Sequence, residues 1–347
     1  MTPTEPPYDS FLLVSFGGPE GPDDVMPFLE NVLRGRNVPR ERMLEVAEHY
    51  YSFGGISPIN AQNRALLESI RHEFAAHGID LPVYWGNRNW HPLLSNTLRQ
   101  MRDDGCQRTL AFFTSMFSSY SGCRQYRENI AAAQQEVGAG APAVDKLRMG
   151  FNHPGFIEPM AENVRRAVVQ VDGDSQTPLL FTAHSIPQSM AENCTYELQL
   201  REACRLVAAA CGSENWHLVY QSRSGPPNQP WLEPDVCDWI EQADDASKLQ
   251  RLVIAPIGFI SDHIEVLYDL DEEAAQVCRG RGIELARAAT VGTHPQFVQM
   301  IRELVQERLG TNSVHRAALG DLGPWHDVCP ANCCLYTPTR PGTPVKS

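Results

Sequence analysis

The sequence lacks the features by which a protein is exported, crosses a membrane or binds nucleic acid. The first ten residues, MTPTEPPYDS, have neither a basic start nor an apolar core, so we expect no export signal. No apolar run approaches the roughly 18 residues that span a bilayer. Lys and Arg number 29 against 42 Asp and Glu, and the net charge of −13 disfavours nucleic acid and anionic membranes as partners. We therefore expect a cytoplasmic protein without stable membrane insertion.

The glycine spacing of a nucleotide-binding loop is also missing. Gly17-Gly18-Pro19 follows a strand-like apolar run, but it does not fit GxGxxG, and the proline removes a backbone donor. This pattern disfavours nucleotide binding.

What is present is the alternation of an α/β protein. Apolar β-type runs alternate with helical patterns along the 347 residues, which is typical of mainly parallel sheets. Three strand–loop units recur in the same order in the two halves of the chain. The matched pairs are FLLVSFGGP (11–19) with LFTAHSIP (180–187), PVYWGNR (82–88) with LVYQSR (218–223), and QRTLAFF (107–113) with QRLVIAP (250–256).

This recurrence predicts a duplicated architecture rather than a tandem repeat, because the offsets differ by tens of residues. We expect two similar α/β lobes, 8–152 and 153–312, followed by a tail at 313–347. Ligands of such folds bind beyond the carboxyl ends of the strands. That rule gathers six loops at one site: 15–20, 86–91, 115–126, 184–187, 221–230 and 257–265.

The segment Pro256–Glu273 follows a strand-like run and carries His263 and three carboxylates, Glu265, Asp269 and Glu273, at intervals of four residues. In an α-helix this spacing drifts by about 40° per step, whereas in a wider π-turn the carboxylates stack almost in line. The row indicates a path for a divalent cation or for protons. The alternative is a solvated acidic helix whose charges favour its dipole.

His184 ends the predicted strand 178–183 and therefore points toward the same group of loops. Alone, it is equally typical of a structural histidine that bonds a neighbouring loop. Together with His263 and Glu265 it suggests a neutral imidazole facing a carboxylate. Such a pair accepts protons from a substrate nitrogen or binds a transition metal.

The tail carries Cys329, Cys333 and Cys334 within CPANCC, and the chain has ten cysteines in all. Three thiols in six residues indicate a metal or iron–sulfur site. Zinc is disfavoured because its usual C-x₂₋₄-C pair is supplied twice, whereas only three ligands are local here. The alternative is reactive or buried thiols in a frayed tail. A fourth ligand must come from elsewhere, and Cys123 in the loop SSYSGCRQY is the best candidate.

Basic residues are fewer than acidic ones, so the closely spaced pair Arg34 and Arg36 stands out. With nearby tyrosines and serines it would form a rim suited to a flat apolar ligand that carries carboxylates. The alternative is an ordinary solvated turn. The candidate rim residues are Arg34, Arg36, Tyr50, Ser57 and Tyr126.

Taken together, these motifs make the chain resemble the ferrochelatases, which are lyases that insert Fe²⁺ into a porphyrin. The resemblance runs through LLVSFGGPEGPDDV, GGISPIN, YWGNRNWHPLL, FTAHSIP, QSRSGPPNQPWLEPDV and PIGFISDHIEVLYDLDEE. It implies two Rossmann-like lobes around a porphyrin cleft, which agrees with the duplication.

Carried over by position, the resemblance makes His184 and Glu265 the catalytic pair that meets Fe²⁺. It places Glu265, Asp269 and Glu273 on a π-type helix. It also implies a [2Fe-2S] cluster held by Cys123, Cys329, Cys333 and Cys334, although the Cys-x₃-Cys-Cys spacing and the place of Cys123 depart from the animal pattern.

Two further departures concern substrate contacts. Phe16, a substrate-binding position, stands where some relatives have Tyr or Met, and a phenyl ring cannot ligate iron. His49 stands where some relatives have an Arg that helps to hold a propionate.

The resemblance favours coproporphyrin III over protoporphyrin IX, because the segment between Arg34 and Gly54 is short and charged, as in soluble bacterial relatives. The implied mechanism bends the porphyrin, with His184 on one face and Glu265 on the other. A cobalt or nickel chelatase and a non-enzymatic haem carrier are the alternatives. The resemblance leaves room for transient contact with the next enzyme of haem synthesis.

Overall fold

The computed structural model describes residues 7–35, 38–225, 228–243, 249–310 and 315–336. Within these residues the chain forms two parallel sheets of four strands each. The first contains β1 (Ser10–Ser15), β2 (Val83–Asn87), β3 (Arg108–Phe113) and β4 (Ala143–Lys146). The second contains β5 (Leu179–His184), β6 (Trp216–Gln221), β7 (Arg251–Ala255) and β8 (Glu284–Arg287).

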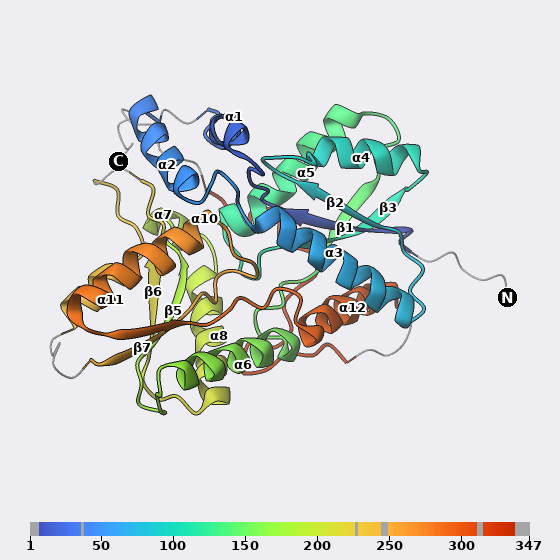
Figure 1. The fold of residues 1–347 in the computed structure, drawn as a ribbon. Helices are drawn as coiled ribbons and strands as arrows, with labels where there is room; N and C mark the ends of the chain where they lie inside the picture. The colour runs from blue at the N-terminus through green and yellow to red at the C-terminus, as the bar shows by residue number, and fades with distance from the viewer. Residues whose placement is uncertain (1–6, 36–37, 226–227, 244–248, 311–314, 337–347) are drawn as a thin grey trace, which may run out of the picture.

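The two sheets have the same strand order, β2-β1-β3-β4 in the first and β6-β5-β7-β8 in the second. The three repeated sequence segments thus form equivalent strands in the two sheets: β1 corresponds to β5, β2 to β6 and β3 to β7. The predicted α/β fold with two similar lobes is therefore confirmed. Figure 1 shows the sheets in separate halves of the molecule, each covered by helices.

Helices connect the parallel strands, as a parallel sheet requires. In the first lobe they are α1 (Pro22–Val32), α2 (Arg40–Ser52), α3 (Ile59–Ala76), α4 (Leu94–Asp103), the π-helix η1 (Tyr120–Arg124) and α5 (Gln125–Val137). In the second they are α6 (Pro154–Gln170), α7 (Gln188–Ala191), α8 (Tyr196–Cys211), α9 (Val236–Gln242), α10 (Ile264–Val266), the π-helix η2 (Leu267–Ala274), α11 (Ala275–Arg281) and α12 (Pro295–Leu309). None of the described helices is long and apolar enough to cross a membrane.

The last helix, α12, lies between the two lobes. It packs against α3 of the first lobe and α6 of the second. Its fully buried Phe297 contacts Phe112 of β3 and Phe156 of α6, with ring centroids 6.1 and 6.4 Å apart. Burying such a side chain contributes about 1.5–3 kcal/mol. The two lobes therefore share one apolar seam.

A buried ion pair fixes α12 to the first lobe. Arg148, which follows β4, donates from Nε and Nη2 to the two carboxylate oxygens of Glu307 on α12 at 2.7 and 2.8 Å. The two side chains are 1% and 4% exposed. Losing Glu307 would leave the Arg148 guanidinium uncompensated in the interior, so this pair holds the lobes in one arrangement.

Candidate functional site

The candidate catalytic residues lie where strands of the second sheet end. His184 is the last residue of β5, and Gln221, its partner in register, is the last residue of β6. The segment that follows β7, the other neighbour of β5, carries His263 and, in the short helix α10, Glu265. Because carboxyl ends of parallel strands share one edge, these side chains converge there, as the sequence predicted.

Glu265 lies between two imidazoles. Its Oε2 is 3.8 Å from His184 Nε2 and 3.9 Å from His263 Nδ1. The Nδ1 of His184 is 2.5 Å from the carbonyl oxygen of Ser185. A carbonyl oxygen can only accept, so Nδ1 carries the proton, and in the neutral ring Nε2 presents its lone pair toward Glu265. Burial lowers the pKa of His263, which favours its neutral form as well.

This geometry corrects the expectation that His184 and Glu265 approach a porphyrin from opposite faces. A flat ring between them would need about 7 Å, twice an ordinary carbon–carbon contact. The observed separation is 3.8 Å. Both groups follow neighbouring strands of one lobe, so they face the same side of any bound ring.

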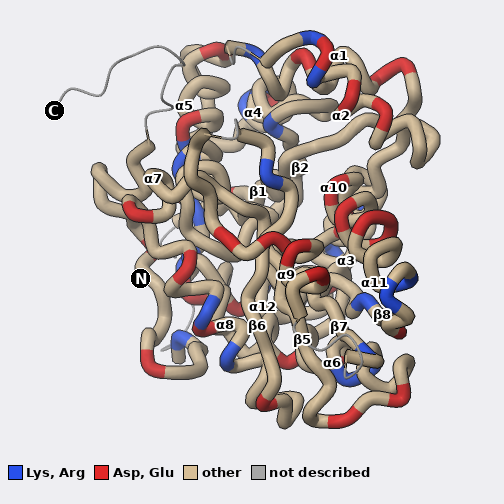
Figure 2. The backbone as a smooth tube through the Cα atoms, turned by 90° about the vertical axis from the view of Figure 1, so that its left-hand side faces the viewer, with Lys and Arg blue, Asp and Glu red and all other residues tan. Residues whose placement is uncertain are grey.

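The carboxylates Glu265, Asp269 and Glu273, called the acid row from here on, lie on α10 and the π-helix η2. The π-helix that the sequence suggested is thus present. Figure 2 shows acidic residues recurring along the tube between α10 and α11. Glu265 is exposed at one end of the row, with 48% of its side chain accessible, and Glu273 is exposed at the other end.

Asp269, the middle member of the acid row, is the most perturbed. Its Oδ2 accepts hydrogen bonds from Gln221 Nε2 at 3.1 Å and from the Ser222 hydroxyl. Burial raises the pKa of Asp269 to about 7 against the opposing effect of the Ser222 bond, and the charge of Glu265 adds to the rise. Asp269 can therefore exchange a proton close to neutral pH. Partial desolvation of the carboxyl group also raises the pKa of Glu273, although the residue as a whole is exposed.

Sequence reasoning missed Gln221 and Ser222 as partners of Asp269. Ser222 adopts a left-handed backbone conformation with φ of 62°, which is uncommon for a residue with a side chain. This turn at the end of β6 aims both side chains at the acid row. Gln221 and Ser222 could have been identified by their position where a predicted strand ends, in the sequence QSRSG.

Helix α2 of the first lobe approaches the acid row from the other side. The ring of His49 stacks on Tyr268 of η2, with centroids 3.7 Å apart. Tyr50 is buried, and burial raises the pKa of its hydroxyl, with a further contribution from the nearby charge of Glu265. The structure thus brings Tyr50, predicted as a rim residue, next to the predicted catalytic carboxylate.

The other predicted rim residues are less closely grouped. Tyr126 is buried and stacks on Phe113 at 5.0 Å, while the Arg88 guanidinium lies over Tyr126 at 4.3 Å and over Phe16 at 5.6 Å. Ser57 is buried, and Arg34 is exposed in the turn after α1. Arg36 lies outside the described residues.

The tail cysteines gather beside η1 of the first lobe. Cys123 is buried and hydrogen bonded to Cys329, and the Sγ atoms of Cys333 and Cys334 are 3.3 Å apart. The hydrogen bond between Cys123 and Cys329 lowers the pKa of Cys329 and raises that of Cys123, so Cys329 is the thiol of this pair that ionises first. The structure therefore brings together all four cysteines that the sequence singled out.

Two further residues belong to this thiol site. His326 offers a ring nitrogen, and its ligand atom and the sulfurs of Cys329 and Cys333 all lie within 4.8 Å of one another. Arg124 of η1 donates from Nη1 to the carbonyl oxygens of Ala331 and Cys333 at 2.9 Å each, which fixes the tail to the first lobe. The position of His326 three residues before Cys329 was the available signal for its role.

Comparison with known proteins agrees with this geometry. The sequence profile of the Ferrochelatase family matches residues 8–309. The chain is 70% identical over 347 residues to a protein of Rhodopirellula baltica named Ferrochelatase, which covers 99% of each chain. It is 51% identical over 358 residues to the Coproporphyrin III ferrochelatase of Streptomyces coelicolor, covering 96% of this chain and 95% of that one.

Solved chelatases have a similar fold. SirB from Bacillus subtilis, determined with Fe³⁺, aligns with a TM-score of 0.54 at 11% identity and covers 89% of this chain and 100% of that one. The sirohydrochlorin chelatase SirB from Bacillus subtilis subspecies spizizenii, determined with cobalt, aligns with a TM-score of 0.52 at 10% identity, covering 87% and 95%. At such low identity this likeness concerns the fold alone.

Proposed function

This chain belongs to the ferrochelatase family, and from that premise we propose that it inserts Fe²⁺ into coproporphyrin III, with coproheme as the product. The observation that carries the proposal is the separation of 3.8 Å between His184 Nε2 and Glu265 Oε2 at the strand ends. The substrate is supported by the Streptomyces relative, whose name specifies coproporphyrin III, whereas the Rhodopirellula name specifies no porphyrin.

His184 and Glu265 are proposed to accept the protons that insertion releases. A porphyrin gives up two N–H protons when Fe²⁺ takes their place. His184 has a lone pair on Nε2, and Glu265 is exposed beside it, so both acceptors reach the same face of the ring. Positioned acceptors of this kind contribute about 10²–10⁴-fold to a rate.

The acid row is proposed to carry iron or protons between solvent and that pair. It joins exposed Glu273 to exposed Glu265 through Asp269, whose pKa of about 7 allows it to gain or lose a proton near neutrality. Oxygen ligands of this type bind Fe²⁺ as it passes. A haem carrier has no use for such a row, which argues against that alternative.

The four cysteines are proposed to hold a [2Fe-2S] cluster. The donor set fits the group, because Cys329 favours the thiolate form that ligates iron, and Cys123 and Cys334 supply buried sulfurs. Cys333 lies directly beside Cys334. Such a cluster supplies one-electron chemistry when bound. The four cysteines that would hold the cluster also link the tail to the first lobe.

Anaerobic incubation of the purified protein with Fe²⁺ and either coproporphyrin III or protoporphyrin IX tests the function. We expect coproporphyrin III to be metallated with the higher kcat/KM. A higher value for protoporphyrin IX would contradict the substrate assignment. Tight haem binding without turnover of either porphyrin would instead indicate a carrier.

A further inference from the structure

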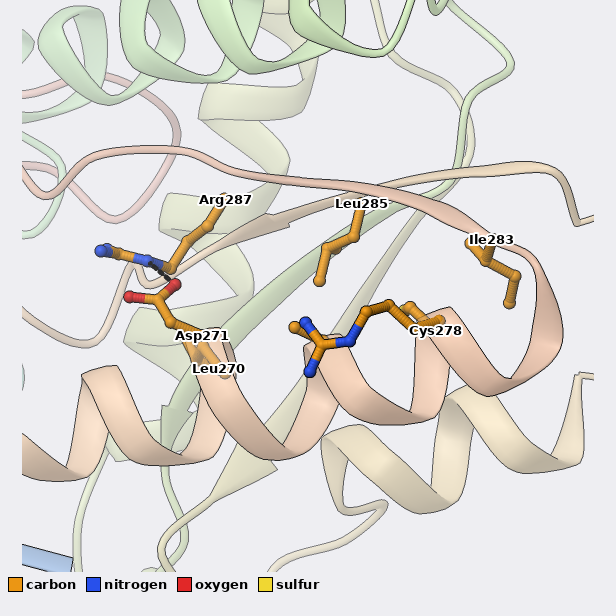
Figure 3. Close-up of a pocket in the computed structure, with 8 residues that line it drawn as sticks. Leu270, Asp271, Cys278, Ile283, Leu285 and Arg287 are labelled. Carbon is orange, nitrogen blue, oxygen red and sulfur yellow. Dashed lines mark hydrogen bonds and ion pairs between the residues drawn. The ribbon is translucent and has the colours of Figure 1, made fainter. Parts of the chain in front are cut away.

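An arginine outside residues 256–273 contacts the π-helix η2 on the side that points away from Asp269. Arg287 is the last residue of the edge strand β8, and 17% of its side chain is exposed. Its Nε donates to Asp271 Oδ1 at 2.6 Å, and its Nη1 donates to Asp262 Oδ1 at 3.0 Å. Figure 3 shows Arg287 reaching from its strand to Asp271, beside a cavity of about 230 Å³. We call this pair of contacts the Arg287 bridge.

The two carboxylates of the Arg287 bridge lie on either side of Glu265 in the sequence. Asp262 directly precedes His263, and Asp271 is two residues beyond Asp269 on η2. Helical residues two apart do not face each other, so Asp271 points away from the side on which Asp269 meets Gln221. The bridge therefore fixes both the start of the segment and the middle of the π-helix to one strand.

Asp262 also links the Arg287 bridge to the first lobe. The backbone N–H of Asp262 donates to Gln62 Oε1 on α3 at 2.9 Å. A displacement of Asp262 would thus move the loop that carries His263 and would alter a contact between the lobes. The chain of contacts runs from α3 through Asp262 and Arg287 to η2.

We propose that Arg287 is a positioning residue for metal insertion, which sets the register of the acid row relative to His263 and the first lobe. The inference rests on the proposed function, because it assumes that Glu265 and Asp269 handle iron or protons. Arg287 acts by holding Asp262 and Asp271 in place, since its guanidinium is occupied by these two carboxylates. Displacements of about 1 Å at a reacting centre can cost on the order of 100-fold in rate.

The test compares Arg287→Met and Arg287→Lys in the full-length protein. We expect Arg287→Met to lower kcat for metallation by about 10- to 100-fold while the porphyrin KM changes by less than about twofold. Arg287→Lys keeps the positive charge, but it lacks the planar guanidinium that bonds both carboxylates at once. It should therefore recover only part of kcat. Asp271→Ala should reproduce most of the loss, and combining it with Arg287→Met should add little.

Arg302→Met is the matched control. Arg302 of α12 donates from Nε to Glu73 at 2.7 Å, and its side chain is 13% exposed. Among the described residues its hydrogen bonds and ion pairs are with Glu73, Glu303 and Gln306, none of which belongs to η2 or the His263 loop. If Arg302→Met lowers kcat as much as Arg287→Met, the bridge is merely structural and the inference is wrong. A rise in porphyrin KM at unchanged kcat would also overturn it.

A measurement without substrate separates this inference from the proposed function. Backbone hydrogen exchange of residues 263–274 should be faster in Arg287→Met than in wild type and in Arg302→Met. If the wild type forms no metalloporphyrin, the proposed function fails, and exchange then decides whether the bridge holds η2. Unchanged exchange in Arg287→Met overturns the inference whatever the activity. If Arg287→Met does not fold, the same comparison is made with Arg287→Lys.

Discussion

The rings of His49 and Tyr268 stack with their planes 10° apart and their centroids separated by 3.7 Å. This stack joins α2 of the first lobe to the π-helix of the second, directly beside the acid row. Burial lowers the pKa of His49, so at neutral pH the stack consists of two uncharged rings. The two lobes thus meet at the residues proposed to handle iron, and a substrate held by both would sense their relative position.

We expect His184→Ala to lower kcat for metallation by about 10²–10⁴-fold, because it removes a proton acceptor. Glu265→Gln should behave similarly, since it keeps the shape of the side chain and loses its charge. Porphyrin binding, measured by fluorescence quenching, should persist in both variants. His217→Ala is the control, because His217 lies at the opposite end of the neighbouring strand β6 and packs against Trp239 with the ring planes tilted by 47°. Turnover close to wild type in His184→Ala would contradict the catalytic assignment.

Asp269 should give metallation a pH dependence near neutrality. Its pKa is raised to about 7 by burial, so the carboxylate that carries iron or a proton is lost as the pH falls below about 7. Wild-type kcat should therefore rise with pH through this value. In Asp269→Asn the rate should be lower and this limb of the pH profile absent. An unchanged profile in the variant would exclude Asp269 as the titrating group.

The same shift predicts a dependence of stability on pH. The folded state raises the pKa of Asp269 from 3.8 to about 7, so it favours the protonated form. The resulting stability is fully present below pH about 4 and is lost as the pH rises through 7, up to about 4 kcal/mol in total. Urea unfolding at several pH values should show a weaker decline in Asp269→Asn than in wild type. Equal slopes for the two proteins would contradict the shift.

Much of the fold could be predicted because three strands of each lobe are apolar sequence segments, which recur in the same order in the other lobe. The fourth strands, β4 (AVDK) and β8 (ELAR), are short edge strands with charged residues, so no apolar pattern identified them. The acid row was predictable because its members lie on one short segment. Its partner Ser222 was not, since a hydrogen bond across neighbouring strand ends depends on a strand order that the sequence does not contain.

The expected opposite-face arrangement failed for the same reason. His184 and Glu265 are 81 residues apart in sequence, and only the pairing of β5 with β7 makes them neighbours. The predicted contact of Tyr126 with the ligand stays a prediction: the structure shows its ring buried against Phe113 within the first lobe. Residue type alone does not distinguish a buried tyrosine from one that faces a ligand.

Changing Arg34 and Arg36 together to Ala should raise the KM for coproporphyrin III more than that for protoporphyrin IX. Coproporphyrin III has four propionates and protoporphyrin IX has two, and each charge-assisted hydrogen bond contributes about 1.5–3 kcal/mol. Steady-state kinetics with both porphyrins measure the difference. Arg42→Ala is the control, since Arg42 forms an exposed pair with Glu45 on α2. Equal effects on the two substrates would remove this support for coproporphyrin III.

The purified protein should contain two irons and two acid-labile sulfides per chain at the thiol site. Replacing Cys329, Cys333 or Cys334 by Ser should remove both, because the cluster needs four sulfurs. Cys123→Ser is the sharper test, since Cys123 comes from the first lobe, and Cys106→Ser, two residues before β3, is the control. Zinc without sulfide in the wild type would contradict the cluster.

Cluster loss should also lower stability, and this gives the four cysteines a readout independent of colour. Binding that joins Cys123 to the tail closes a loop of about 200 residues, and ligands that bind only the folded state stabilise it. The thermal midpoint of Cys123→Ser should therefore fall further than that of Cys106→Ser. Arg124→Met should lower it less, because Arg124 fixes the tail through two carbonyl oxygens without being a ligand. A Cys123→Ser protein with full iron, full sulfide and an unchanged midpoint would place the fourth ligand elsewhere.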